Sequence, residues 1–158
     1  MKINQKFKPF LVFALVLIVT ASLLRFYKLP YRQYWMLDEE RDAFIVKKIL
    51  VDKRPTLIGG ALPGGFYLAP GYFYISSVFN FIFSMNPVAM GYVAATVGTL
   101  SALLLFFTAN KMFSPSVAVI STFFYTFSYL VVIYNRTWWP LTPSIPVSIA
   151  CYLSLYKI

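Results

Sequence analysis

The stretch PFLVFALVLIVTASLL, residues 9–24, decides the fold class, because no charged side chain interrupts it. The apolar character continues to about Leu29. A hydrocarbon core about 30 Å thick needs roughly 20 largely apolar helical residues to cross it. We therefore expect a membrane-spanning helix over residues 9–29. Lys2, Lys6 and Lys8 precede it, so a cleaved signal peptide ending near Thr20–Ser22 is the alternative interpretation.

The composition of the whole chain agrees with a membrane protein. The 158 residues are 59% hydrophobic and only 12% charged, against about 25% charged in ordinary globular chains, and mean hydropathy is +0.70. These values exclude a soluble globule and a disordered chain. The chain has no His and one Cys, Cys151, so imidazole chemistry, an internal disulfide and multi-Cys metal sites are excluded. The net charge of +9 does not indicate nucleic-acid binding, because many of the basic residues flank apolar spans.

Further apolar segments follow along the chain. We expect an all-α, polytopic transmembrane bundle of four to five spans, with a helical first loop at about 30–67. The expected spans are 9–29, 68–85, 88–113, 116–134 and 143–158, with a break at Asn86-Pro87. Small residues at Gly91, Ala94, Ala95, Gly98 and Ala102 would let the third span pack closely against its neighbours. The last segment is short for a crossing, so we expect the front part of a longer protein, with a natural short protein as the alternative.

All five acidic residues lie in one loop: Asp38, Glu39, Glu40, Asp42 and Asp52. Any carboxylate chemistry must therefore reside there. A helix is predicted from Asp38 to about Lys53, and Asp38 has two interpretations. It is a helix cap, because Asp is favoured at that position, or it is a general base beside a membrane span, flanked by Tyr34, Trp35 and Arg41.

Basic and aromatic residues around this loop are also open to two interpretations. Lys28, Arg32 and Arg41 are either interface anchors or ligands of a lipid-linked phosphate. Gly59-Gly60 and Gly64-Gly65 indicate a loop without stable secondary structure, either a connector or a mobile segment over a substrate. It is no P-loop, because no Gly-Lys-Ser/Thr follows.

Three motifs in succession resemble the N-terminal part of the GT-C membrane glycosyltransferases, the group of protein O-mannosyltransferases (family 39) and the aminoarabinose transferase of lipid A. The motifs are Leu37-Asp38-Glu39-Glu40-Arg41-Asp42-Ala43, then Ala69-Pro70-Gly71-Tyr72-Phe73-Tyr74, and then Tyr134-Asn135-Arg136-Thr137-Trp138-Trp139-Pro140. The second departs from the family's Pro-Pro-Leu-Tyr pattern. The resemblance extends over nearly the whole chain.

The resemblance implies a function. The donor would be a polyprenyl-phosphate sugar, the first loop would face away from the cytoplasm, and the N-terminus would lie inside. Asp38 would be the catalytic base for inverting attack, with Glu39 as the second acidic position. Arg41, Arg32, Pro70, Tyr72 and Arg136 are the candidate substrate- or phosphate-binding residues. The resemblance does not specify whether the acceptor group is a hydroxyl or an amine, or whether a glycan, a lipid or a protein carries it.

Counting basic residues does not settle the orientation, since residues 25–54 hold eight Lys and Arg. If every span crosses fully, Arg136 lies on the side opposite Asp38, which conflicts with a shared site. A bound Mg²⁺ or Mn²⁺ is left open, and no metal site is predicted. The alternatives to an enzyme are a non-catalytic, lipid-binding or assembly subunit and half of a transporter. The second is disfavoured because no ionisable residue sits at mid-span.

Overall fold

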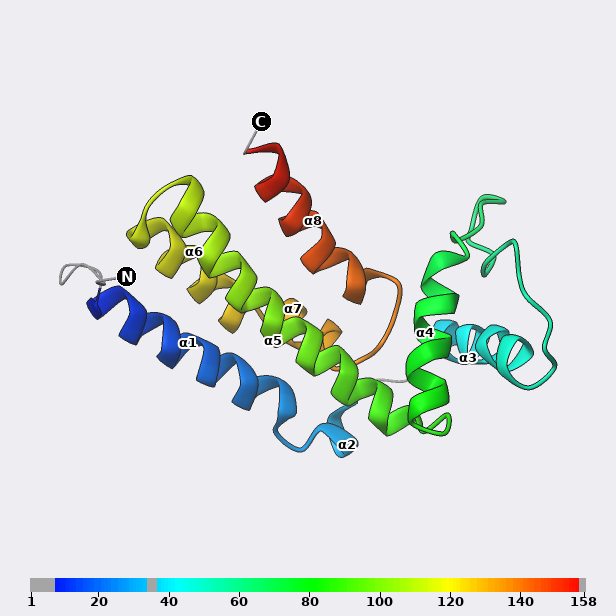
Figure 1. The fold of residues 1–158 in the computed structure, drawn as a ribbon. Coiled ribbons are helices and arrows are strands. Elements are labelled where there is room, and N and C mark those ends of the chain that lie inside the picture. The colour runs from blue at the N-terminus through cyan, green and yellow to red at the C-terminus, as the bar shows by residue number, and fades with distance from the viewer. Residues whose placement is uncertain (1–7, 34–36, 157–158) are drawn as a thin grey trace.

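The computed structural model describes residues 8–33 and 37–156, which form helices joined by short connections (Figure 1). Lys2, Lys6, Tyr34 and Trp35, and the end of the predicted last span, lie outside the described residues. The helices are α1 (Lys8–Phe26), α2 (Leu29–Arg32), α3 (Leu37–Leu50), α4 (Gly71–Ile82), α5 (Pro87–Met112), α6 (Pro115–Phe127), α7 (Tyr129–Tyr134) and α8 (Leu141–Leu155). The all-α prediction is confirmed.

Sequence signals explain where the longest helix begins. The Asn86 side chain accepts a hydrogen bond from the Val88 amide at 2.9 Å, and Pro87 occupies the first turn. Proline is favoured there, because its missing N–H is one that the helix leaves unpaired. Ser114 and Pro115 open α6 in the same way, with the Ser114 hydroxyl accepting from the Val117 amide at 3.3 Å. The predicted break at Asn86-Pro87 is confirmed.

Small residues on α5 allow the bundle to close. Helices α1, α5 and α6 contact one another, and α8 contacts α5 (Figure 1). The predicted small-residue stripe of α5 is buried along its length. A Cβ atom on Gly91 would lie 2.8 Å from Gln33 Oε1, and one on Gly98 would lie 2.5 Å from Asn135 Cγ. These two glycines therefore set how closely the neighbouring segments approach.

Helix α4 does not run the length of the bundle. The predicted span 68–85 forms a helix of only 12 residues, which packs against α3. Its first turn contacts Trp138, and the chain then enters α5 at Pro87, whose carbonyl accepts a hydrogen bond from Gln33 Nε2 at 2.9 Å. Both ends of α4 thus lie at the end of the bundle where α1 finishes and α5 begins.

The predicted span 116–134 is divided. Helix α6 ends at Phe127, and Ser128 adopts an extended conformation with φ −62° and ψ 115° before α7 begins. Because α6 and α7 together run back towards α3, the connection between α7 and α8 lies at the same end as the acidic helix. This arrangement removes the conflict over Arg136, because α4 adds no pass along the bundle.

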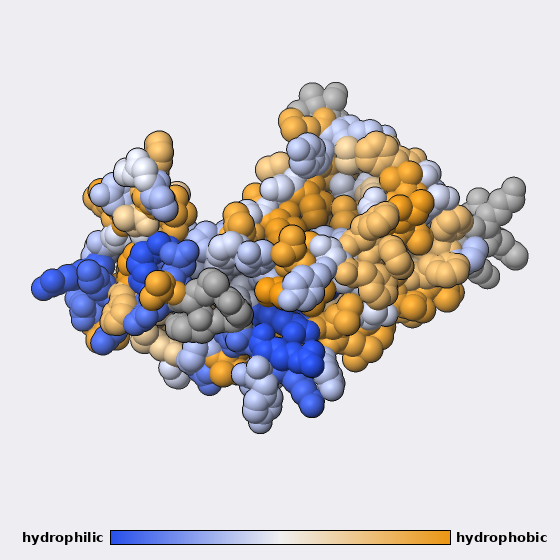
Figure 2. Space-filling view, turned by 180° about the vertical axis from the view of Figure 1, so that it is seen from behind, coloured by the Kyte–Doolittle hydropathy of each residue, from blue (hydrophilic) through white to orange (hydrophobic). Residues whose placement is uncertain are grey.

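Among the residues that the structure describes, two helices are long and apolar enough to cross a membrane: α1 over Pro9–Phe26 and α5. Helices α6 and α8 are apolar but shorter. Figure 2 shows apolar side chains over most of the bundle, while hydrophilic side chains gather at the end that holds α2 and α3. On this face the molecule therefore has an apolar body and a polar end.

Candidate functional site

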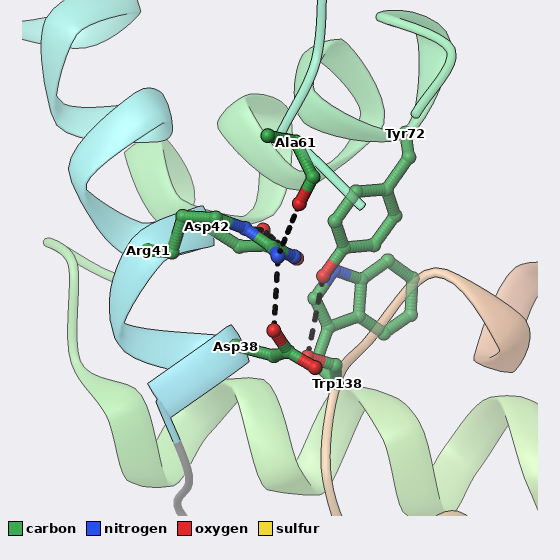
Figure 3. A network of polar contacts seen from close by, with 6 residues as sticks. All are labelled: Asp38, Arg41, Asp42, Ala61, Tyr72 and Trp138. Atoms are coloured by element: carbon green, nitrogen blue, oxygen red, sulfur yellow. Dashed lines mark hydrogen bonds and ion pairs between the residues drawn. The ribbon is translucent and has the colours of Figure 1, made fainter. Parts of the chain in front are cut away.

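The polar end is organised around the guanidinium group of Arg41 (Figure 3). Its Nη1 donates to Asp38 Oδ1 at 2.9 Å, and its Nε and Nη2 donate to Asp42 Oδ1 at 2.9 and 2.8 Å. All three residues lie in the first turns of α3, where carboxylates are favoured by the helix dipole. Arg41 therefore fixes two carboxylates relative to each other.

Three of the carboxylates at the start of α3, those of Asp38, Glu39 and Asp42, differ in their access to solvent. The Asp38 side chain is 62% exposed, whereas that of Asp42 is 6% exposed and Glu39 is buried. Burial raises the pKa of Asp42 above its ordinary value, and the bonds from Arg41 oppose this shift. Asp38 is the carboxylate of the network that a molecule from solution can reach, and Asp42 acts as an internal partner of Arg41.

A short hairpin covers the outer side of Arg41. The Ala61 carbonyl accepts from Arg41 Nη1 at 3.1 Å. Backbone bonds Gly59 N–H to Leu68 O at 3.0 Å and Leu68 N–H to Gly60 O at 2.9 Å close the hairpin. A Cβ atom on Gly60 would lie 2.5 Å from Arg41 Nε. The glycine-rich loop, expected to lack stable structure, is thus a hairpin fitted onto the network.

Trp138 joins α4 to the connection between α7 and α8. The Tyr72 hydroxyl donates to the Trp138 carbonyl at 3.3 Å, and Trp138 Nε1 donates to Ser76 Oγ at 2.8 Å. The rings of Tyr72 and Trp138 stack at 6.3 Å. Pro70 caps α4, and its carbonyl accepts from the Phe73 amide at 3.0 Å. The predicted residues Pro70 and Tyr72 therefore position the helix that borders the site.

Arg136 lies in the same connection and is 8% exposed. Its guanidinium donates to the Leu24 carbonyl, and its Nε is buried with no hydrogen-bond partner among the described residues. Burial, followed by the nearby charge of Arg32, lowers the pKa of Arg136. A buried guanidinium with a free donor and a cationic neighbour is suited to an anion.

The remaining predicted cations are placed differently. The Arg32 guanidinium lies 5.1 Å from the centre of the Tyr27 ring, and Lys28 Nζ lies 5.6 Å from the same ring. Both side chains thus sit on an aromatic ring at the end of α1. Of these two cations, Arg32 is the one whose charge lowers the pKa of Arg136.

Two cavities flank Glu39. A cavity of about 320 Å³ is lined by Asp38, Glu39, Tyr129, Leu130, Ile133, Tyr134, Thr137 and Trp139. A smaller cavity of about 70 Å³ includes Glu39, Asp42, Tyr72 and Trp138 in its lining. The larger cavity brings together α3 and the α7–α8 connection, which are about 100 residues apart in the chain. Within the described residues no group of three metal-ligating side chains occurs.

No family model, curated protein or solved structure matches the chain.

Sequence reasoning did not find three features of this end of the molecule. Asp42 and Trp138 lie inside quoted motifs but were not selected, because their role depends on contacts between distant segments. Arg25, in the last turn of α1, is fully buried and donates to the Ala21 and Tyr125 carbonyls at 3.1 and 3.4 Å. An arginine inside an apolar segment was the one available signal for this residue.

Proposed function

We propose that the chain is the N-terminal part of a multi-pass membrane glycosyltransferase of the GT-C type. It transfers a sugar from a polyprenyl-phosphate donor to an acceptor hydroxyl or amine on the extracytoplasmic side. Helices α1, α5, α6 with α7, and α8 are the proposed crossings, and the N-terminus is cytoplasmic. Helix α4 lies with α3 at the extracytoplasmic end.

One observation carries the proposal: Asp38 and Glu39 border the same cavity as Thr137 and Trp139. The sequence motifs that resemble the family are far apart in the chain, yet their residues meet at one polar end of apolar helices. Such an end is where the headgroup of a membrane-embedded donor would lie. An exposed carboxylate and a buried arginine at this end of the molecule suit a lipid substrate with a polar head.

The proposed reaction assigns a part to each group. Asp38 takes the proton of the acceptor hydroxyl, and the freed oxygen attacks the anomeric carbon of the donor. The bond between that carbon and the phosphate oxygen breaks, and its electron pair leaves with the polyprenyl phosphate. Arg136 and Arg32 stabilise the charge on this phosphate. Arg41 is already paired with two carboxylates, which favours a role in holding Asp38 over direct phosphate binding.

The test is sugar transfer in membranes that contain the complete gene product. The substrate is a polyprenyl-phosphate sugar with a radiolabelled sugar, and the readout is label in products that no longer carry the polyprenyl group. Asp38→Asn is expected to reduce transfer by about 10²–10⁴-fold, the contribution typical of a general base. Glu40→Gln, at an exposed neighbouring acid, is the matched control and should keep the wild-type rate. An undiminished rate with Asp38→Asn removes Asp38 from the mechanism.

A second candidate function is a non-catalytic lipid-binding subunit. It is favoured by a groove of about 570 Å³ beside α4 and α5, lined by Phe79, Phe83, Ala89, Tyr92, Val93, Thr96, Val97 and Leu100. Its lining is apolar apart from one hydroxyl and one phenol, which suits a hydrocarbon chain. Lipid that stays bound in an Asp38→Asn variant, together with no transfer by the wild type, would favour this candidate.

A further inference from the structure

The exposed face of α4 is apolar, whereas its buried face carries polar side chains. Two of its three buried residues are Ser76 and Ser77, and the Ser76 hydroxyl accepts from Trp138 Nε1 at 2.8 Å. In a helix that faces water, the polar side chains lie outside and the apolar ones inside. The large outward side chains of α4 are 39–74% exposed, and they are Tyr74, Ile75, Val78, Phe81 and Ile82.

Helix α4 lies beside the first turns of α5, which is one of the proposed crossings (Figure 1). Phe79 packs against the buried residues Met90 and Ala94 of α5. The apolar groove of about 570 Å³ runs between the second half of α4 and residues 89–100 of α5. Lipid that surrounds this part of a crossing helix also meets the exposed face of α4.

Cations lie at the hairpin end of this apolar face. Lys48 and Arg54 line a pocket of about 470 Å³ together with Ile58. The Tyr74 hydroxyl donates to the Thr56 carbonyl at 2.8 Å, which attaches residues 54–58 to the first turn of α4. The apolar face and the basic pocket therefore form one continuous surface.

The two cations of this pocket are available to an external anion. Arg41 also borders the pocket, but it is paired with two carboxylates of α3. Neither Lys48 nor Arg54 forms an ion pair among the described residues, and no acidic residue lines the pocket. Leu57 and Ile58 beside it are 87% and 60% exposed. Basic side chains next to exposed apolar ones are typical of a surface that enters an anionic leaflet.

We infer that α4 and residues 54–58 enter the extracytoplasmic leaflet, where the apolar face of α4 contacts acyl chains and Lys48 and Arg54 bind the headgroup of an anionic phospholipid. The inference rests on the crossings of the proposed function and is independent of sugar transfer. A second copy of the chain fits this surface less well, since all five of its acidic residues lie within residues 38–52 of the same region.

The first experiment measures which quencher reaches α4 in the complete protein. Single cysteines replace Val78 or Phe81 after the other cysteines, Cys151 included, have been removed, and each carries a bimane fluorophore. The protein is held in nanodiscs of phosphatidylcholine with a doxyl quencher on one acyl chain, and iodide is the quencher in water. We expect strong quenching by the doxyl lipid and weak quenching by iodide at both positions. Glu40→Cys, at an exposed acid on α3, is the control and should show the reverse.

The second experiment measures the preference for an anionic headgroup. Bimane on Leu57→Cys is quenched by doxyl-labelled phosphatidylglycerol or, in parallel, by doxyl-labelled phosphatidylcholine. Because two cations attract the anionic lipid, we expect phosphatidylglycerol to quench at a roughly tenfold lower mole fraction. Lys48→Gln together with Arg54→Gln should abolish this difference and leave quenching at position 78 unchanged. Lys111→Gln, at an exposed lysine at the far end of α5, is the matched control and should keep the difference.

Three results would overturn the inference. Iodide quenching at positions 78 and 81 as strong as at Glu40→Cys would place the face of α4 in water. Quenching by neither reagent would place it against another segment of the protein or a second copy. Equal quenching by the two lipids at position 57 would remove the anionic headgroup from the basic pocket.

This inference and the proposed function fail separately. Lipid contact at position 78 without sugar transfer would keep the membrane surface and remove the enzyme. Transfer that depends on Asp38, with position 78 in water, would keep the enzyme and remove the membrane surface.

Discussion

Substitution of Gly98 by alanine tests the packing that holds the α7–α8 connection in place. The new Cβ atom would lie 2.5 Å from Asn135 Cγ, 2.6 Å from Nδ2 and 2.7 Å from Cβ. Asn135 is 1% exposed, and its Nδ2 donates to the Tyr125 hydroxyl at 3.1 Å. That hydroxyl donates in turn to the Gly98 carbonyl at 3.2 Å. Asn135 therefore has little freedom to move away from the added methyl group.

Two opposing effects set the change in the free energy of unfolding that Gly98→Ala causes. Replacing glycine by alanine inside a helix gains about 1 kcal/mol of helix propensity. Overpacking a buried site costs about 1–3 kcal/mol, and the three close contacts place this site at the upper end. We expect a net loss of about 1–2 kcal/mol, or a fall in Tm of roughly 2–8 °C for a chain of this size.

The assay is thermal unfolding of the purified protein in nanodiscs, followed by circular dichroism. Gly71→Ala is the matched control, because a Cβ atom there meets nothing within 4 Å, and its Tm should stay within about 2 °C of the wild type. Asn135→Ala in the Gly98→Ala background removes the contacts with Cγ and Nδ2 and keeps the one with Cβ, so the two losses should add only in part. A Gly98→Ala protein as stable as the wild type would refute the close approach of α5 and residue 135.

Three further predictions concern the polar end. Gly60→Ala should displace the Arg41 side chain and loosen the hairpin, so that the Leu68 amide exchanges hydrogen faster. Trp138→Phe loses the hydrogen bond to Ser76 Oγ and should cost about 1 kcal/mol in thermal unfolding. Burial raises the pKa of Asp42, so ionisation of this carboxyl opposes folding. The contribution of Asp42 to stability is therefore highest below its ordinary pKa of 3.8 and falls as the pH rises through the raised pKa. Asp42→Asn should remove that fall from a plot of Tm against pH.

Each of these predictions has a clear contrary result. Unchanged exchange at Leu68 would show that the hairpin does not rest on Arg41. A Trp138→Phe protein with the wild-type Tm would show that the hydrogen bond from Trp138 to Ser76 on α4 does not stabilise the fold. If Tm varies with pH in the same way in Asp42→Asn and in the wild type, burial does not raise the pKa of Asp42. Glu40→Gln, which removes an exposed acid, is the control.

Local signals predicted much of the helical content. The uninterrupted apolar run of α1, the Asn86-Pro87 start of α5 and the acidic first turn of α3 are all visible within a few residues of sequence. The small residues of α5 correctly indicated a buried face. Such features depend on propensity, capping and periodicity, which act over short distances in the chain.

The rest depended on tertiary contacts. Nothing in the apolar run 116–134 marks Ser128 as a break, since neither Gly nor Pro occurs there. The position of α4 follows from the pairing of Tyr72 and Ser76 with Trp138, which lies more than 60 residues away. Counting spans therefore placed Arg136 away from Asp38, whereas the short α4 brings both to one end. The number of membrane crossings and the family itself stay predictions.

Sidedness labelling tests whether Asp38 and the α7–α8 connection lie at the same end of the molecule. In a Cys151→Ser background, single cysteines replace Leu37, Leu141 and Lys111, all exposed and the last at the far end of α5. A membrane-impermeant maleimide is applied to sealed vesicles of known orientation. We expect Leu37→Cys and Leu141→Cys to react only from the extracytoplasmic side, and Lys111→Cys only from the cytoplasmic side. Labelling of positions 37 and 141 from opposite sides, or of position 37 from the cytoplasm, would contradict it.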